Sequence, residues 1–174
     1  MKIILINPYG PLPNEGWRKY RNILLGETLA KKNHDVVWYT SKFSHHFKRD
    51  RDIEYYTGYD NFTVELVKSK KYINNISINR LLFEITFCIN LYFRLKKVKH
   101  IDLIIAADPS QFIGFLARIL AKKYKSKLIL DLMDEWPELF EKVLSGNKKI
   151  LIKPVVNFFK FLRKKNYQKA DGVI

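Results

Sequence analysis

Short apolar runs alternate along the chain with longer amphipathic stretches, and this pattern predicts an α/β fold. The short runs indicate buried strands, because a strand covered on both faces is apolar at nearly every position. They cover residues 2–6, 36–39, 62–67, 102–107, 127–132 and 172–174. Helical periodicity covers residues 17–32, 73–98, 109–124, 134–144 and 154–168. Strands that alternate with helices in this way predict a Rossmann-like, doubly wound parallel sheet.

A loop rich in proline and glycine follows the first predicted strand, at residues 7–16. In doubly wound sheets, ligands bind beyond the carboxyl ends of the strands, and a connection this long is often functional. Gly16 precedes the predicted helix 17–32, whose free N–H groups and dipole attract phosphate, and Arg18 and Arg21 add positive charge. An ordinary turn glycine with solvated arginines is the alternative. The fingerprints G-x-G-x-x-G and Walker A are absent, which argues against a dehydrogenase or a P-loop enzyme.

Two adjacent histidines stand in the loop after the second predicted strand, where residues 41–48 read SKFSHHFK. His45 and His46 could bind an acidic group or transfer a proton, and Lys48 adds a positive charge. The alternative is a polar loop that faces solvent. No third metal ligand stands at a suitable spacing, so we expect no metal site here. The single cysteine, Cys88, excludes an internal disulfide and a cysteine metal cluster.

Carboxylates follow two later strands, at Asp108 and within residues 131–138. Asp108 precedes a proline, and this pair is also a good helix start, so capping alone would explain it. The second segment, DLMDEWPE, holds four carboxylates, among them Glu135, which could ligate a divalent cation or orient sugar hydroxyl groups. Acidic residues are also favoured by the dipole in a first helical turn, so the spacing does not decide between these interpretations.

The net charge of +15 indicates a polyanionic partner, such as nucleic acid, an anionic membrane or a substrate that carries phosphate. Two predicted helices, residues 73–98 and 154–168, combine apolar and basic positions, which favours an anionic membrane surface. The residues that we expect to contact such a membrane are Phe83, Phe87, Leu91, Arg94, Lys160, Arg163 and Lys164. The alternative is a core on one side of each helix and solvated charge on the other. No apolar run approaches the roughly 20 residues of a membrane span.

Four segments, taken in order, resemble the N-terminal domain of family 4 glycosyltransferases, in the bacterial branch that builds O-antigen, capsule and similar surface polysaccharides. Residues 21–37 resemble the family's Arg-x-x-x-Leu…Leu…Gly-His-x-Val stretch, although Asn33 stands at the usual glycine. Residues 41–48 are similar to its Ser-x-Phe-x-His…Lys loop. Residues 131–140 (DLMDEWPELF) resemble its Asp-x-x-Asp-x-Trp-Pro-Glu segment, and residues 169–174 (KADGVI) resemble its Ala-Asp-x-Ile-Ile segment.

The resemblance implies a GT-B fold, in which two Rossmann-like domains enclose a cleft. The N-terminal domain of the family binds the acceptor, and the C-terminal domain binds the nucleotide sugar. On this basis we expect residues 1–174 to be a single acceptor-side domain that lacks the donor-binding domain and is inactive alone. The implied reaction is metal-independent and needs no cofactor. It transfers a sugar from a nucleotide-sugar donor to a polyprenyl-diphosphate-linked saccharide, in the synthesis of lipopolysaccharide or capsule at the cytoplasmic face of the plasma membrane.

The site residues follow from the resemblance and from their places at the strand ends. We expect Gly16 and Arg18 to approach the donor diphosphate. The residues expected to bind the acceptor, its phosphates or its sugar hydroxyl groups are Arg21, His45, His46, Lys48, Asp108 and Glu135. No catalytic residue is assigned. Two alternatives remain: a stand-alone, membrane-associated subunit that binds the acceptor without catalysis, and a nucleic-acid-binding module, which no recognition helix or RNP-like signature supports.

Overall fold

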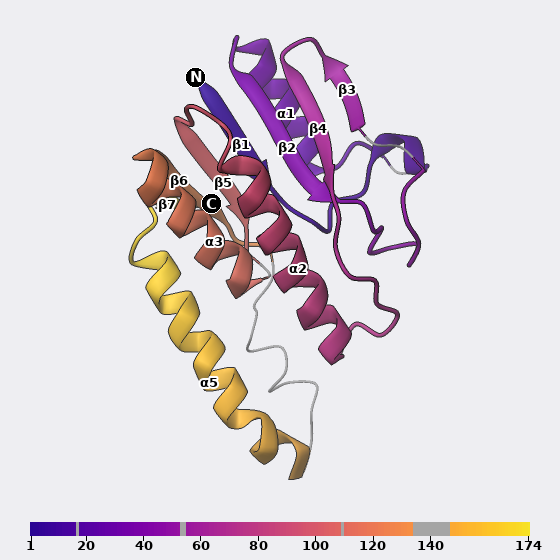
Figure 1. The fold of residues 1–174 in the computed structure, drawn as a ribbon, viewed down its shortest axis with the longest axis vertical. Helices are drawn as coiled ribbons and strands as arrows, with labels where there is room; N and C mark the ends of the chain where they lie inside the picture. Colours follow the sequence, from indigo (N-terminus) through magenta and orange to yellow (C-terminus); the bar gives the residue numbers. More distant parts are fainter. Residues whose placement is uncertain (17, 53–54, 109, 134–146) are drawn as a thin grey trace.

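Seven strands form one sheet in the computed structural model, which describes residues 1–16, 18–52, 55–108, 110–133 and 147–174. The strands are β1 (Lys2–Ile6), β2 (Asp35–Ser41), β3 (Tyr55–Tyr59), β4 (Phe62–Val67), β5 (Leu103–Ala107), β6 (Lys127–Asp131) and β7 (Gly172–Val173). Their order across the sheet is β3-β4-β2-β1-β5-β6-β7 (Figure 1). All neighbouring pairs are parallel except β3 with β4. The predicted doubly wound α/β fold is thereby confirmed.

Strand β3 was not expected, because the sequence predicts only a loop between the strands at residues 36–39 and 62–67. The strand is an antiparallel partner of β4 at the edge of the sheet. The turn between the two strands is held by Asn61, whose side-chain Nδ2 donates to the carbonyl oxygens of Ala30 and His34 at 2.8 and 2.9 Å. β3 follows a polar, basic stretch and contains Gly58, so no local apolar run reveals it.

The helices are α1 (Arg21–Lys31), α2 (Ile78–Leu95), α3 (Gln111–Tyr124) and α5 (Asn147–Tyr167), with a 3-10 helix, η1 (Pro13–Glu15). Both α1 and α2 begin later than the sequence predicts. α2 begins after Ser77, whose side chain accepts a hydrogen bond from the N–H of Arg80 and so caps the first turn. α5 begins before Pro154 rather than at it. The predicted helix 134–144 lies outside the described residues.

Helices cover both faces of the sheet, and a hydrophobic core lies on each side. α1 covers one face, where Trp38 and Phe62 are fully buried. α2 and α3 cover the other face, and α5 packs against α3 (Figure 1). Among the described residues, no helix combines the length and the apolar character that a membrane crossing requires.

The buried side of α2 corrects one prediction. Phe83, Phe87 and Leu91 are all 0% exposed, because this side of the helix faces the sheet and the loops at its carboxyl edge. The predicted membrane contact is therefore wrong for these three residues, which belong to the core. The large apolar side chains that α2 does expose are Ile78, Ile89 and Phe93.

Candidate functional site

The strand order places a candidate site between β1 and β5. From β1 the chain proceeds to β2 and β4 on one side, and from β5 it proceeds to β6 and β7 on the other. The loops that leave the carboxyl ends of β1 and β5 therefore diverge, which opens a crevice where ligands bind in folds of this type. Asn7 begins the first of these loops, and Asp108 begins the second.

A pocket of about 170 Å³ lies at this switch point. Its wall combines the loop after β1, the start of α1, the loop after β2, the first turn of α2 and the residues after β6. The lining residues are Asn7, Tyr9, Gly10, Pro11, Tyr20, His45, His46, Arg80 and Met133. We call this the switch-point pocket. Segments that are far apart in the sequence thus meet at one edge of the sheet.

Asn7 fixes the loop that forms the floor of the switch-point pocket. Its side-chain Nδ2 donates to Oδ1 of Asn22 at 2.7 Å, and its Oδ1 accepts a hydrogen bond from the N–H of Tyr9 at 2.9 Å. The indole Nε1 of Trp38 donates to the carbonyl oxygen of Asn7 at 3.1 Å. Trp38 also explains Gly10, because a Cβ at that position would stand 2.6 Å from the indole ring.

A buried carboxylate, Glu84, holds the side chains behind the switch-point pocket. It accepts hydrogen bonds from the hydroxyl groups of Tyr9 and, at 2.7 Å, of Ser110, and the guanidinium of Arg80 lies 3.9 Å away. Burial raises the pKa of Glu84, although the hydrogen bonds from Ser110 and Tyr9 oppose this rise. Burial and the nearby Glu84 carboxylate also raise the pKa of Tyr9, so its hydroxyl remains a donor.

His45 is uncharged in the switch-point pocket near neutral pH. Burial, with smaller contributions from Lys48, Arg80 and His46, lowers its pKa to about 4. Its Nδ1 shares a hydrogen bond with the hydroxyl of Tyr72. Burial likewise lowers the pKa of His46. The two predicted histidines therefore do line the candidate site, where neutral imidazoles can exchange hydrogen bonds with a ligand, and Arg80 contributes a positive charge to the pocket wall.

The structure does not have the helix start at Gly16 on which the predicted phosphate site depended. Gly16, with a φ of 80°, ends η1 in the left-handed conformation, and α1 begins only at Arg21. No helix N-terminus therefore stands at Gly16. The Arg21 guanidinium instead pairs with the buried carboxylate of Asp131, at 2.8 and 2.7 Å, which joins the start of α1 to the end of β6. Arg18 lines a separate surface hollow that is formed with residues of α1.

Two further predicted acceptor residues, Lys48 and Asp108, do not line the switch-point pocket. Lys48 lies with its Nζ 4.2 Å above the Tyr72 ring and donates to Asn75 at 2.6 Å. Asp108 is buried and accepts a hydrogen bond from Gln111 at 2.8 Å. Its carboxylate therefore stabilises the start of α3 and is not exposed to a ligand at the surface. Glu135 lies outside the described residues. Among those residues, no group of three or more His, Cys, Asp or Glu side chains could hold a metal ion.

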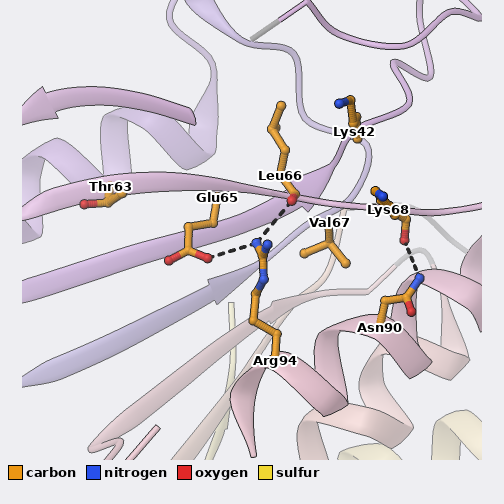
Figure 2. A pocket seen from close by; sticks show the side chains of 8 residues that line it. All are labelled: Lys42, Thr63, Glu65, Leu66, Val67, Lys68, Asn90 and Arg94. Atoms are coloured by element: carbon orange, nitrogen blue, oxygen red, sulfur yellow. Dashed lines mark hydrogen bonds and ion pairs between the residues drawn. The ribbon is translucent and has the colours of Figure 1, made fainter. Parts of the chain in front are cut away.

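A second, larger groove of about 640 Å³ runs between β4 and α2 (Figure 2). Figure 2 shows the Arg94 guanidinium reaching across it to the carboxylate of Glu65 and the carbonyl oxygen of Leu66, at 3.0 and 3.1 Å. The side chain of Asn90 donates to the carbonyl oxygen of Lys68 at 2.9 Å. Arg94 thus attaches α2 to the sheet, although the sequence had predicted a membrane contact for its side chain. This groove lies along an outer strand, away from the switch point.

Tyr9, Tyr20 and Arg80 are site residues that the sequence did not identify. Tyr9 and Tyr20 stand in or next to the loop that was predicted to be functional, but their types carried no specific signal. Arg80 was visible only as a polar residue of a helix that is apolar on most sides. The signal that could have found it is its i, i+4 spacing to Glu84, an uncommon acid in an apolar helix.

Comparison with solved structures finds sucrose-phosphate synthase from Thermosynechococcus elongatus, with a TM-score of 0.66 and 15% identity over 99% of this chain. The chain spans 41% of the length of that protein. A second structure of this enzyme from the same organism gives a TM-score of 0.55 and 14% identity, and covers 100% of this chain and 87% of the other.

The catalytic domain of starch synthase IV from Arabidopsis thaliana, bound to ADP and acarbose, gives a TM-score of 0.48 and 12% identity, over 75% of this chain and 33% of the other. No family model matches the sequence, and no curated protein matches it significantly. At these identities the two structures of sucrose-phosphate synthase establish the fold, and the chain has the Rossmann-like architecture of one half of a GT-B glycosyltransferase.

Proposed function

We propose that this chain is the acceptor-side domain of a glycosyltransferase that moves a sugar from a nucleotide-sugar donor to a lipid-linked saccharide during synthesis of a surface polysaccharide. The observation that carries the proposal is the switch-point pocket, which combines a cation and aromatic rings at the edge of the sheet where such folds bind ligands. The GT-B fold agrees with it.

The chemistry of the pocket suits a sugar next to a phosphate. Arg80 offers a planar guanidinium that can bind phosphate oxygens in pairs. One of its terminal nitrogens donates to the carbonyl oxygen of Asn75 at 3.1 Å, and its Nε lies 3.9 Å from the carboxylate of Glu84. Tyr9 and Tyr20 offer ring faces and hydroxyl groups. The neutral His45 and His46 can exchange hydrogen bonds with sugar hydroxyl groups without attracting free anions. A diphosphate-linked saccharide presents phosphate oxygens and sugar hydroxyl groups next to each other.

This proposal assigns none of the described residues to the nucleotide-sugar donor. We expect the nucleotide sugar to be held mainly by a second Rossmann-like domain, and we assign no catalytic residue and no cofactor or metal. The charge of +15 favours a location at an anionic membrane, and we propose the cytoplasmic face of the plasma membrane, where a lipid-linked acceptor would be presented.

The test is binding of an isoprenyl-diphosphate-linked monosaccharide with a short, water-soluble isoprenyl chain. In ¹H–¹⁵N spectra of residues 1–174, we expect its addition to shift the signals of Tyr9, Tyr20 and His45. Arg80→Gln should weaken binding about tenfold, because it removes a charge-assisted contact. Lys68→Gln is the matched control, since it removes the same charge from the groove of Figure 2.

Each variant is first compared with the parent chain by thermal unfolding, so that a loss of binding is not a loss of fold. Equal binding by Arg80→Gln and Lys68→Gln would contradict the assignment of the switch-point pocket. Binding that shifts only residues of the groove in Figure 2 would transfer the acceptor site to that groove. No binding by a folded chain would refute the proposed acceptor class.

A further inference from the structure

An apolar groove of about 570 Å³ lies between α2 and α3. Its wall consists of aliphatic and aromatic side chains together with the thiol of Cys88. Four large side chains of the groove are substantially exposed, namely Ile89 and Phe93 on α2 and Phe115 and Ile119 on α3. We call this feature the α2–α3 groove. It is distinct from the buried stripe of α2, which faces the sheet.

Three cations lie against aromatic rings of the α2–α3 groove. The Nζ atom of Lys96 lies 4.6 Å from the centre of the Phe93 ring, and the guanidinium of Arg118 lies 5.2 Å from the centre of the Phe115 ring. Lys123 lies 5.9 Å from the ring of Tyr92 at the groove wall. Two of these rings, Phe93 and Phe115, are exposed, so apolar surface and positive charge lie side by side within one patch.

Negative charge is nearly absent from the two helices that form the groove. The one acidic residue within α2 and α3 is Glu84, and it is buried behind the switch-point pocket. α5, which packs against α3, has no acidic residue and exposes Phe158 and Phe161, and Lys165 lies 5.7 Å from the ring of Phe161. Figure 1 shows α2, α3 and α5 together on the same face of the sheet.

We infer that the α2–α3 groove and its cationic rim form a docking surface for an anionic lipid bilayer. Exposed Phe and Ile side chains would enter the interface, while Lys96, Arg118 and Lys123 would contact lipid phosphates. A second copy of the chain fits less well, because a self-association through this patch would bring two cationic rims together. This inference deepens the proposed location at a membrane, and it identifies the surface that makes the contact.

The test is flotation of residues 1–174 with vesicles of phosphatidylcholine alone or with about one third phosphatidylglycerol. We expect binding to the anionic vesicles only, and a loss of that binding at high salt. The vesicles contain no lipid-linked saccharide, so failure here and failure of the proposed acceptor binding are separate results. A chain that binds both kinds of vesicle equally, or neither, would overturn the inference.

Matched variants locate the contact. Phe93→Ser should weaken binding about tenfold, because it removes apolar surface from the proposed contact. Leu24→Ser is the matched control and should leave binding unchanged. The two side chains are equally exposed, at 52% for Phe93 and 51% for Leu24, but Leu24 belongs to α1 on the opposite face of the sheet. The double change Lys96→Glu and Lys123→Glu should weaken binding more than tenfold. The same charge change at Lys31 and Lys32, at the end of α1, should have a smaller effect.

A fluorophore gives a readout that does not depend on affinity. In a Cys88→Ser background, a polarity-sensitive label at Phe93→Cys should shift to the blue on anionic vesicles, and one at Leu24→Cys should not. Equal weakening by Phe93→Ser and Leu24→Ser would refute the assignment of this face. The assignment would also be refuted if the chain bound no vesicles but formed a dimer in sedimentation velocity, and Phe93→Ser disrupted that dimer.

Discussion

Replacement of Arg51 by methionine is expected to destabilise the loops around the switch-point pocket. The side chain of Arg51 is 1% exposed, and its Nε donates to Glu15 at 3.0 Å. One terminal nitrogen donates to the carbonyl oxygen of Gly10 at 2.8 Å, and the other donates to the carbonyl oxygen of Ser41. Glu15 in turn accepts a hydrogen bond from the N–H of Leu12 at 2.8 Å. One guanidinium therefore joins the loop after β1, η1 and the end of β2.

The size of the effect follows from the partners that would be left behind. Methionine has a similar volume but no donor, so two buried carbonyl oxygens would lose the guanidinium as a donor and the carboxylate of Glu15 would lose the opposite charge. Removal of one member of a buried ion pair costs about 3–5 kcal/mol, and we take this as the total because the contacts share one group. For a chain of this length, that loss would lower Tm by roughly 6–20 °C.

The measurement is urea unfolding followed by circular dichroism. Arg49→Met is the matched control, because Arg49 is exposed and stands two positions away. The double variant Arg51→Met with Glu15→Gln should recover about 1 kcal/mol or more, since it removes the unpaired negative charge. A loss below about 1 kcal/mol for Arg51→Met, or an effect equal to that of Arg49→Met, would refute the reasoning.

Two further predictions concern His45 and Gly26. Because the pKa of His45 is lowered to about 4 from 6.5, the unfolded chain takes up a proton between these pH values before the folded chain does. Stability should therefore fall as the pH drops through this window, by roughly 1–2 kcal/mol after allowance for solvent screening, and His45→Gln should flatten the profile. An NMR titration that gives this imidazole a pKa near 6.5 would contradict the expectation. Gly26→Ala should destabilise the chain by about 1–3 kcal/mol in urea, because the new Cβ would stand 2.4 Å from the ring of the fully buried Phe62. Helix propensity alone would give a gain of about 1 kcal/mol, so a stabilised variant would show that Phe62 can move.

The architecture was largely predictable because it depends on local patterns. Six parallel strands have apolar runs, and the rule that ligands bind at the carboxyl edge directed attention to the loops after β1 and β2. His45 and His46 were found in this way. β3 was missed, because an edge strand pairs through its backbone and needs no apolar run.

The contacts of the site were less predictable because they join residues that are distant in sequence. Tyr9 and Glu84 are separated by 75 positions, and Arg21 and Asp131 by 110 positions. Nothing in either neighbourhood indicates these partners. Arg21 was assigned to a ligand because of its positive charge and the family resemblance, and its ion pair with the buried carboxylate of Asp131 alters that interpretation. A charged residue at a strand end can serve the fold as readily as it serves a ligand.

Helix α2 shows why hydropathy alone misplaced the membrane contact. The helix is apolar on most sides because its successive stripes face different surroundings. Phe87 and Leu91 face the sheet, and Phe83 packs against the loops at its carboxyl edge. Asn90 and Arg94 face β4, and Ile89 and Phe93 face the α2–α3 groove. Arg80, in the first turn, lines the switch-point pocket.

The same helix therefore connects the two proposed binding surfaces. Phe93 stands thirteen positions after Arg80, which corresponds to about 20 Å along a helix. That span is short enough for a bilayer docked at the groove and a phosphate at Arg80 to belong to one lipid-linked acceptor. If so, Phe93→Ser should weaken binding of an acceptor embedded in vesicles while leaving binding of the short, water-soluble acceptor unchanged. Equal weakening of both would show that the groove supports the pocket structurally and not through the membrane.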